Sequence, residues 1–249
     1  MSQIGRSCPP TKYDLLMAET ARHLAEEDYR LADKGLRKAI ALEPGQPTAY
    51  HNLGVALSNV GRYAEAAQSY LQAAARYSEP SVNWADSTAS AFNRLLLLEC
   101  DEVAKPEWWD DEALKVLSKT VIGAAGAGNR QQGLQSCLMR AQVLSGQHPT
   151  WESGPRSAAD LKEAAKHSKR AAQLSPDRKR EYERFAADLL RQSASVEADE
   201  AEFNAMVRVD VETNTVADAP ISAIAEEAAE TVGASKTAAT AASASKAPS

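Results

Sequence analysis

The sequence predicts an all-α protein, and three observations support this. Alanine is abundant, while aromatic residues make up only 6% of the 249 residues, which suits helices packed through small side chains. Residues 32–39 and 66–73 share the pattern A-x3-(L/Y)-x2-A and start 34 residues apart. Tyr29 and Tyr63, just before them, keep the same interval. A fixed period near 34 residues is typical of stacked helix-turn-helix units.

The first hairpin is predicted from two helices. The first covers about residues 12–27, where apolar positions match those of the second hairpin if one extra residue sits in the following turn. Its partner covers about residues 30–42 and is ended by Pro44 and Gly45, since proline and glycine interrupt helices. Residues 1–12 precede this hairpin and are predicted to be a flexible leader.

The second hairpin, residues 47–77, carries the pattern in full. Its first helix has Y-x2-L-G-x2-L, its turn has a glycine, and its second helix has A-x3-Y-x2-A. Gly54 and Ala66 are small where two helices of a hairpin cross closely. The unit closely resembles the tetratricopeptide repeat, whose helices carry W-x2-L-G-x2-Y and A-x3-F. The resemblance covers residues 13–80 and implies a protein-interaction role.

The third and fourth hairpins are degenerate. In the third, one helix is expected from about Pro80 to Val103, and Pro106 then opens a second helix carrying Trp108 and Trp109. Adjacent helical residues point about 100° apart, so one tryptophan is expected to pack inward while the other covers the junction or contacts a partner. The fourth hairpin contains a long connection near Gly146, and its second helix repeats the alanine spacing of the earlier units.

A final helix from Asp177 to about Met206 is expected to cap the stack. From about Val209 large apolar residues nearly vanish, which predicts a disordered tail. The predicted fold is therefore a right-handed superhelical stack of about four hairpins, two near-consensus and two degenerate, with a capping helix. Its domains are a leader (1–12), a helical-repeat domain (13–208) and an Ala/Ser/Glu-rich tail (209–249).

Composition and motifs argue against several functions. The net charge of −6 does not suit a polyanion-binding chain, and neither a secretory h-region nor a membrane-length apolar run occurs in the sequence. Three distant cysteines are read as reduced thiols in a cytoplasmic or nuclear protein. No metal-ligand spacing, phosphate loop or nucleophile motif is present. We therefore expect no enzyme activity, no cofactor, no metal and no small-molecule substrate.

The resemblance places the binding surface on the first helix of each hairpin, which lines a concave groove in the family. The groove residues predicted in this chain are Arg22, His51, Asn52, Asn59, Asp86, Asn93 and Gln135. Carboxamides offer a donor and an acceptor to an extended backbone, so the predicted partner is a protein or peptide segment. Capture of a C-terminal chaperone carboxylate is not expected, because Asp86 occupies a position where that function needs a cation.

Two alternatives remain open. The chain is either an adaptor of this kind or a constitutive subunit of a larger assembly that uses its other surfaces. A basic face within residues 162–184 could instead bind an acidic partner, and nucleic acid is the weaker option because acidic residues interrupt the face. The cations singled out on this face are Lys166, Lys169, Arg170, Lys179 and Arg180.

Overall fold

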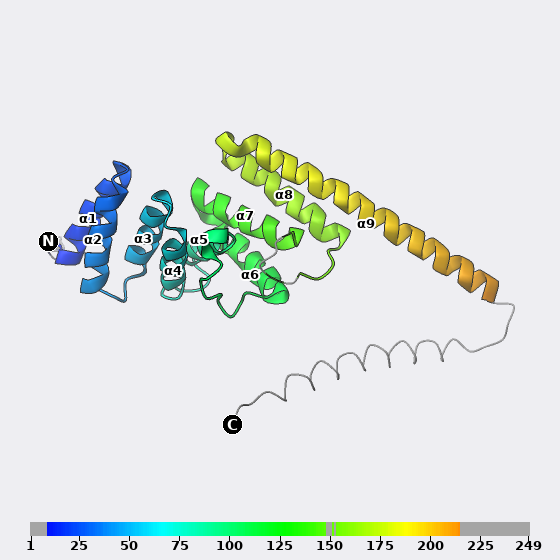
Figure 1. Cartoon of the computed structure of the whole chain (residues 1–249), viewed down its shortest axis with the longest axis horizontal. Coiled ribbons are helices and arrows are strands. Elements are labelled where there is room, and N and C mark those ends of the chain that lie inside the picture. The colour runs from blue at the N-terminus through cyan, green and yellow to red at the C-terminus, as the bar shows by residue number, and fades with distance from the viewer. Residues whose placement is uncertain (1–8, 148–150, 152, 215–249) are drawn as a thin grey trace, which may run out of the picture. The chain divides into compact units, whose positions relative to one another are not determined.

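The structure, a computed structural model, describes residues 9–147, 151 and 153–214. Within these residues it contains nine α-helices, three short 3-10 helices and no strand (Figure 1). The chain divides into two compact units, residues 1–197 and 198–249. The α-helices are α1 (Lys12–Ala25), α2 (Tyr29–Leu42), α3 (Pro47–Asn59), α4 (Tyr63–Ala74), α5 (Val82–Leu95), α6 (Asp111–Ala124), α7 (Arg130–Ser145), α8 (Ala158–Leu174) and α9 (Lys179–Asn214).

Helices that follow one another in the sequence also pack against one another. α1 contacts α2, α2 contacts α3, and the series continues through α4 to α5. Beyond α5, α6 and α7 contact each other and both contact α5, while α7 packs along α8. In Figure 1 these helices accordingly form a row of hairpins. The predicted all-α class built from helical hairpins is confirmed.

Polar residues at the helix starts explain where many of the helices begin. The side chain of each such residue accepts a hydrogen bond from a backbone amide in the first turn, which satisfies a donor that the helix leaves unpaired. These N-cap residues are Thr11, Asp28, Ser81, Asp110, Asn129 and Ser157. At the other end, Gly146 terminates α7 with a φ of 61°, a backbone conformation that favours glycine.

The first two hairpins are held together by close helix crossings. Gly54 of α3 lies against the Tyr70 ring of α4, and a Cβ on Gly54 would be 2.7 Å from Tyr70 Cε1. In the first hairpin the glycine is on the second helix, because Gly35 of α2 lies against Thr20 of α1. Ala66 is fully buried in the same core. Small residues therefore set the approach of the helices, as the pattern in the second hairpin predicts.

The third hairpin departs from the predicted helix boundaries. The helix expected to reach Val103 ends at Leu95, and a separate 3-10 turn, η1 (Leu98–Cys100), follows. Leu97 between them is extended, with φ −79° and ψ 142°. The Lys105 ammonium donates to the Cys100 carbonyl at 2.9 Å and so stabilises the turn. The apolar residues 95–98, which suggested a longer helix, therefore lie partly beyond the end of α5.

Both tryptophans of the third hairpin precede its second helix. The prediction that Pro106 opens this helix is wrong, since α6 begins at Asp111. Trp108 and Trp109 are both half-buried in the adjoining clusters, and their ring centroids are 5.8 Å apart. The 100° argument does not apply outside a helix, and both rings pack against the core.

A clasp connects the α7–α8 connection to the start of α6. The Arg156 guanidinium donates to both Asp111 carboxylate oxygens, at 2.5 and 2.7 Å, and to the Val143 carbonyl at 3.0 Å. Lys115 lies 3.1 Å from the same carboxylate. The guanidinium holds the pKa of Asp111 far below its ordinary value. We call this Arg156–Asp111 pair, with its carbonyl contact, the clasp.

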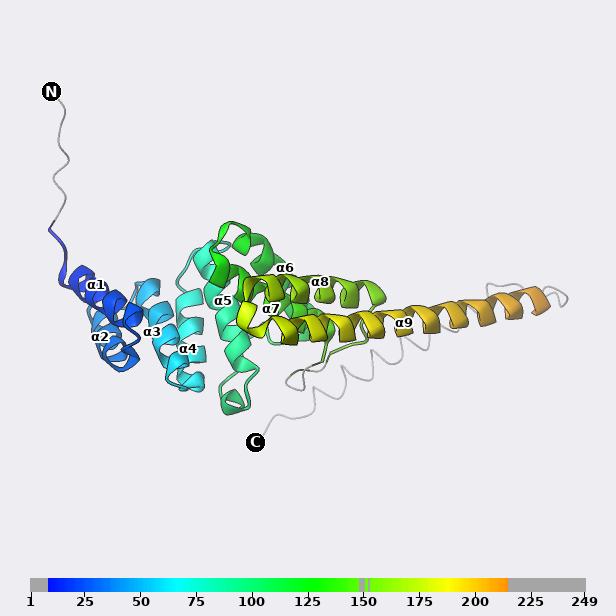
Figure 2. The same cartoon turned by 90° about the horizontal axis from the view of Figure 1, so that it is seen from above.

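Residues 179–197 of α9 cover α8, as expected for a capping helix (Figure 2). Ala186 and Leu189 are buried in a cluster with Leu161 of α8, and the Ser193 hydroxyl donates to the Ala158 carbonyl at 3.1 Å. The helical segment 198–214 belongs to the second unit, and its side chains are exposed through Val207.

The predicted domain boundary at residue 208 falls inside α9, which continues to Asn214. Of the predicted tail, residues 215–249 lie outside the described residues, as do residues 1–8 of the predicted leader. No described helix combines the length and apolarity that crossing a membrane requires.

Candidate functional site

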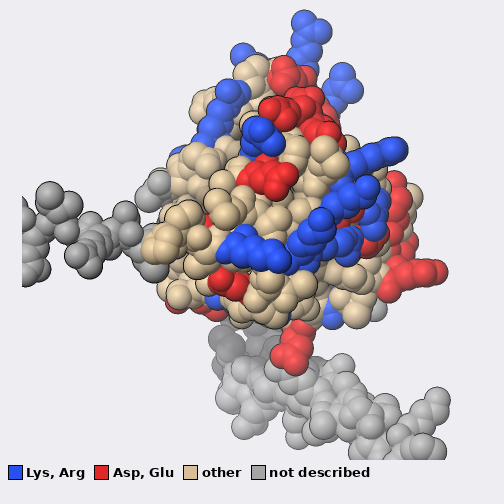
Figure 3. Space-filling view, turned by 90° about the vertical axis from the view of Figure 1, so that its left-hand side faces the viewer, with Lys and Arg blue, Asp and Glu red and all other residues tan. Residues whose placement is uncertain are grey.

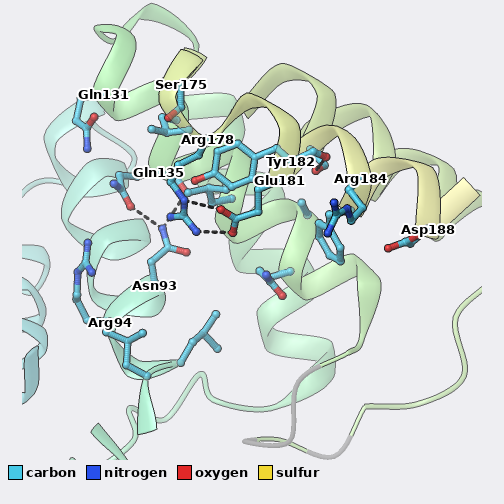
Figure 4. Close-up of a pocket in the computed structure, with 18 residues that line it drawn as sticks. Asn93, Arg94, Gln131, Gln135, Ser175, Arg178, Glu181, Tyr182, Arg184 and Asp188 are labelled. Carbon is cyan, nitrogen blue, oxygen red and sulfur yellow. Dashed lines mark hydrogen bonds and ion pairs between the residues drawn. The ribbon is translucent and has the colours of Figure 1, made fainter. Parts of the chain in front are cut away.

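Two adjoining cavities lie in the first unit. The first, of about 350 Å³, lies among α3, α4, α5 and α7. The second, of about 710 Å³, lies among α5, α7 and α9 (Figure 4). Arg94, Gln131 and Gln135 line both cavities, so the two open onto a shared wall. We refer to the pair as the double groove.

The first cavity contains a half-buried histidine with a carboxylate partner. Nδ1 of His51 is 2.9 Å from the Ser87 hydroxyl, and its Nε2 is 3.5 Å from an Asp86 carboxylate oxygen. Burial lowers the pKa of His51, although Asp86 opposes this. Burial likewise raises the pKa of Asp86, against the effect of His51 and of a hydrogen bond from Gln132. Although these residue types could serve nucleophilic catalysis, Ser87 is 0% exposed and cannot reach a substrate.

An amide pair joins two walls of the second cavity. The Asn93 side-chain amide of α5 donates to the Gln135 side-chain oxygen at 2.7 Å and to the Gln135 backbone carbonyl at 3.1 Å (Figure 4). These bonds fix α5 against α7 at the groove wall. The apolar side chains around the pair come from Leu96, Leu97, Leu134, Leu138 and Phe185.

The structure brings together most of the residues predicted for the groove. Those lining the double groove are His51, Asn59, Asp86, Asn93 and Gln135.

The other predicted groove residues, Arg22 and Asn52, line neither cavity. Arg22 is exposed on α1, and Asn52 is half-buried on α3. Asn59 lines the first cavity but donates to the Val55 carbonyl of its own helix at 2.9 Å.

Arg94, a half-buried cation in the double groove, was not predicted from the sequence. Its guanidinium carbon is 5.7 Å from the centre of the Tyr63 ring. The Nε atom is buried and has no hydrogen-bond partner within the described chain, and no carboxylate there forms an ion pair with Arg94. A sequence signal existed, because no acidic residue lies three or four positions before or after Arg94.

The predicted basic face is exposed around the end of α8 and the start of α9. Its five cations have exposed side chains, and among the described residues only Lys179 is ion-paired, at 3.8 Å from Glu183. The acidic residues that interrupt the sequence do not neutralise the other four cations, which are Lys166, Lys169, Arg170 and Arg180.

A second basic band lies at the other end of the first unit. Figure 3, viewed from the α1–α2 end, shows Lys and Arg side chains crossing the surface in a band. Arg30, Lys34 and Lys38 of α2 are exposed at four-residue spacing and so share one helix face. Arg37 beside them is neutralised by Asp33 at 2.6 Å. This band was not predicted from the sequence.

Tyr70 should make the stability of the first cavity's wall depend on alkaline pH. Burial raises the pKa of Tyr70 from 10.0 to about 12. Between pH 10 and 12 the folded protein therefore keeps the phenol proton, whereas the unfolded chain releases it. The contribution of Tyr70 to the free energy of unfolding is thus fully present below pH 10 and is lost as the pH rises towards 12. Urea unfolding of the wild type should lose about 1 kcal/mol more than Tyr70→Phe between pH 8 and pH 11.

The matched control for this measurement is Tyr29→Phe, at a half-buried tyrosine of α2. It should follow the wild type across the same pH range. If Tyr70→Phe loses as much stability as the wild type, the buried phenol does not cause the pH dependence.

Metal binding finds no support in the part of the chain that the structure describes. No group of three or more His, Cys, Asp or Glu side chains there could hold an ion. The two cysteines described, Cys100 and Cys137, are buried free thiols, and burial raises the pKa of each.

The comparison with protein families agrees with the fold. Residues 36–68 match the family model described as tetratricopeptide repeat, so the predicted resemblance is confirmed in the segment from α2 to α4. A similar solved structure, described as "MamA RS-1 ArsTM double mutant", covers 77% of this chain and 98% of its own. Its sequence identity is 14% and its TM-score is 0.44. No curated protein sequence matches the chain. The repeat match supports a general role in protein interaction.

Proposed function

We propose that this helical-repeat chain, with its tetratricopeptide-repeat match at residues 36–68, is an adaptor that binds an extended segment of a partner protein in the double groove. The observation that carries the proposal is the pair of cavities joined at Arg94, Gln131 and Gln135. Volumes of about 350 and 710 Å³ suit a few side chains of a bound segment.

The chemistry of the walls suits a peptide. Leucine and phenylalanine side chains of the second cavity offer apolar area to bulky side chains, which is the main source of binding energy. Gln131 is exposed at the wall shared by both cavities, so its carboxamide can donate to and accept from a main chain. The Asn93–Gln135 pair holds this wall in place before a ligand arrives, which lowers the entropic cost of binding.

Site-specific photo-cross-linking tests this proposal in the full-length chain. A cross-linker at Gln131 samples the double groove, and the same cross-linker at Val116, which is 68% exposed on α6, samples another surface. We expect the groove position to cross-link one contiguous segment of a partner and the α6 position to give none of that product. The purified segment should then bind wild type at least 10-fold more tightly than Gln131→Trp, which fills the groove.

The alternative of an assembly subunit predicts the reverse pattern. Cross-links from Val116 or from the basic face, with none from Gln131, would refute groove binding. Equal affinity of the partner segment for wild type and Gln131→Trp would refute it as well.

A further inference from the structure

Among the described residues that line the double groove, the carboxylates are paired, whereas two cations have no ion-pair partner. Each carboxylate there already has a partner. Glu181 accepts from Arg178 at 2.8 Å, and Asp188 pairs with Arg191. Asp86 faces His51 and accepts from Gln132.

Two cations of the groove lack such partners. Arg94 and Arg184 have no ion pair among the residues described, and Arg94 also keeps a buried Nε without a hydrogen bond. The buried Nε of this half-buried guanidinium has lost hydration without gaining a hydrogen bond, so an anion brought to Arg94 would gain a charge-assisted hydrogen bond.

We propose that the segment bound in the double groove carries an aspartate or glutamate side chain that pairs with Arg94, next to a bulky apolar residue. The apolar residue would sit on Leu96, Leu134 and Phe185, which line the same cavity as Arg94. This inference rests on the proposed function, and it names the partner's chemistry.

The position of Arg94 favours a side-chain carboxylate over a chain terminus. Arg94 lines both cavities, so a segment that meets it can continue into the groove on either side. A segment ending at Arg94 would leave one cavity empty. The leucine-rich floor also disfavours nucleic acid, which needs several phosphate-neutralising cations and stacking aromatic rings.

Peptide selection on the full-length protein tests this inference. The probe is a library of displayed random decapeptides fused at both ends, so that no free C-terminal carboxylate is present. Wild type should enrich Asp or Glu within three positions of Leu, Ile, Phe or Met. Arg94→Met should lose the acidic preference and keep the apolar one, while Arg30→Met, at an exposed arginine of α2, should behave as wild type.

A double-mutant cycle then measures the pair. For an enriched peptide, Asp→Asn or Glu→Gln should lower affinity for wild type about 10-fold, and should change affinity for Arg94→Met less than 2-fold. Arg94→Met should not lower the melting temperature, because Arg94 forms no ion pair within the described chain. A purely structural role would lower it.

The possible failures are distinguishable. If Gln131→Trp enriches the same peptides as wild type, or if no peptide is enriched, groove binding itself is refuted. Two other results are enriched peptides that depend on the groove but show no acidic preference, and an acidic preference that persists in Arg94→Met. Either result would overturn only the role of Arg94. So would selective binding of a 20-nucleotide single strand that Arg94→Met abolishes.

Discussion

Gly54→Ala should lower the free energy of unfolding by about 2 kcal/mol. The added Cβ would lie 2.7 to 2.9 Å from three ring carbons of Tyr70, a rigid side chain that is itself buried. Either α3 moves away from α4 or the ring leaves its rotamer, and both disturb the core of the first two hairpins. Helix propensity alone would favour alanine by up to about 1 kcal/mol, so a loss of stability is informative. Urea denaturation followed by circular dichroism measures it.

Two further variants identify the cause. Gly123→Ala in α6 adds a Cβ that would meet nothing within 4 Å, so it should be neutral or stabilising. In a Tyr70→Ala background the ring is absent, and Gly54→Ala should then cost nothing. If Gly54→Ala is equally destabilising with and without the Tyr70 ring, the close crossing does not explain the glycine.

Arg156→Met should lower the free energy of unfolding by about 3 kcal/mol. The side chains of Arg156 and Asp111 are only 6% and 12% exposed, so the variant leaves a largely buried carboxylate without its main partner. Lys115, at 3.1 Å, compensates in part and keeps the loss near the lower end for such pairs. For a unit of this size the melting temperature should fall by roughly 6–12 °C, measured by calorimetry.

The control for the clasp is an exposed ion pair. Arg191 is 79% exposed where it meets Asp188, so Arg191→Met should change stability by less than about 0.5 kcal/mol. Adding Asp111→Leu to Arg156→Met should recover part of the loss, since it removes the unpaired charge. No recovery, or an equal effect of Arg191→Met, would contradict the clasp.

The sequence predicted the regular part of the fold because its signals are local. Spacing of alanine, glycine and tyrosine in residues 29–73 is enough to define two hairpins. The third hairpin could not be predicted as well, because its boundaries depend on side-chain contacts outside the helices themselves. Lys105 donates to the carbonyl of Leu95, the last residue of α5, and to that of Cys100. Trp109 packs on Phe92 at 5.3 Å and on Trp151 at 5.8 Å.

The candidate site was likewise predictable only in part. The tetratricopeptide resemblance pointed to polar residues on the first helix of each hairpin, and five of the seven predicted residues line the double groove. Arg22 and Asn52 could not be excluded from the predicted groove, because a residue's position along a helix does not show where neighbouring helices leave space. Arg94 was missed because its significance depends on which carboxylates surround it in three dimensions, and those come from α5 and α9.

The clasp has a consequence for how the repeats melt. In an ideal repeat array each unit touches only its neighbours, so terminal units can fray independently of the interior. Here Arg156 reaches back 45 residues to Asp111, and Trp151 enters the aromatic cluster around Phe92. Opening the α7–α8 connection would thus expose the third hairpin's core at the same time. The C-terminal half of the first unit should therefore exchange its amide hydrogens as one cooperative block, whereas α1 and α2 can open alone.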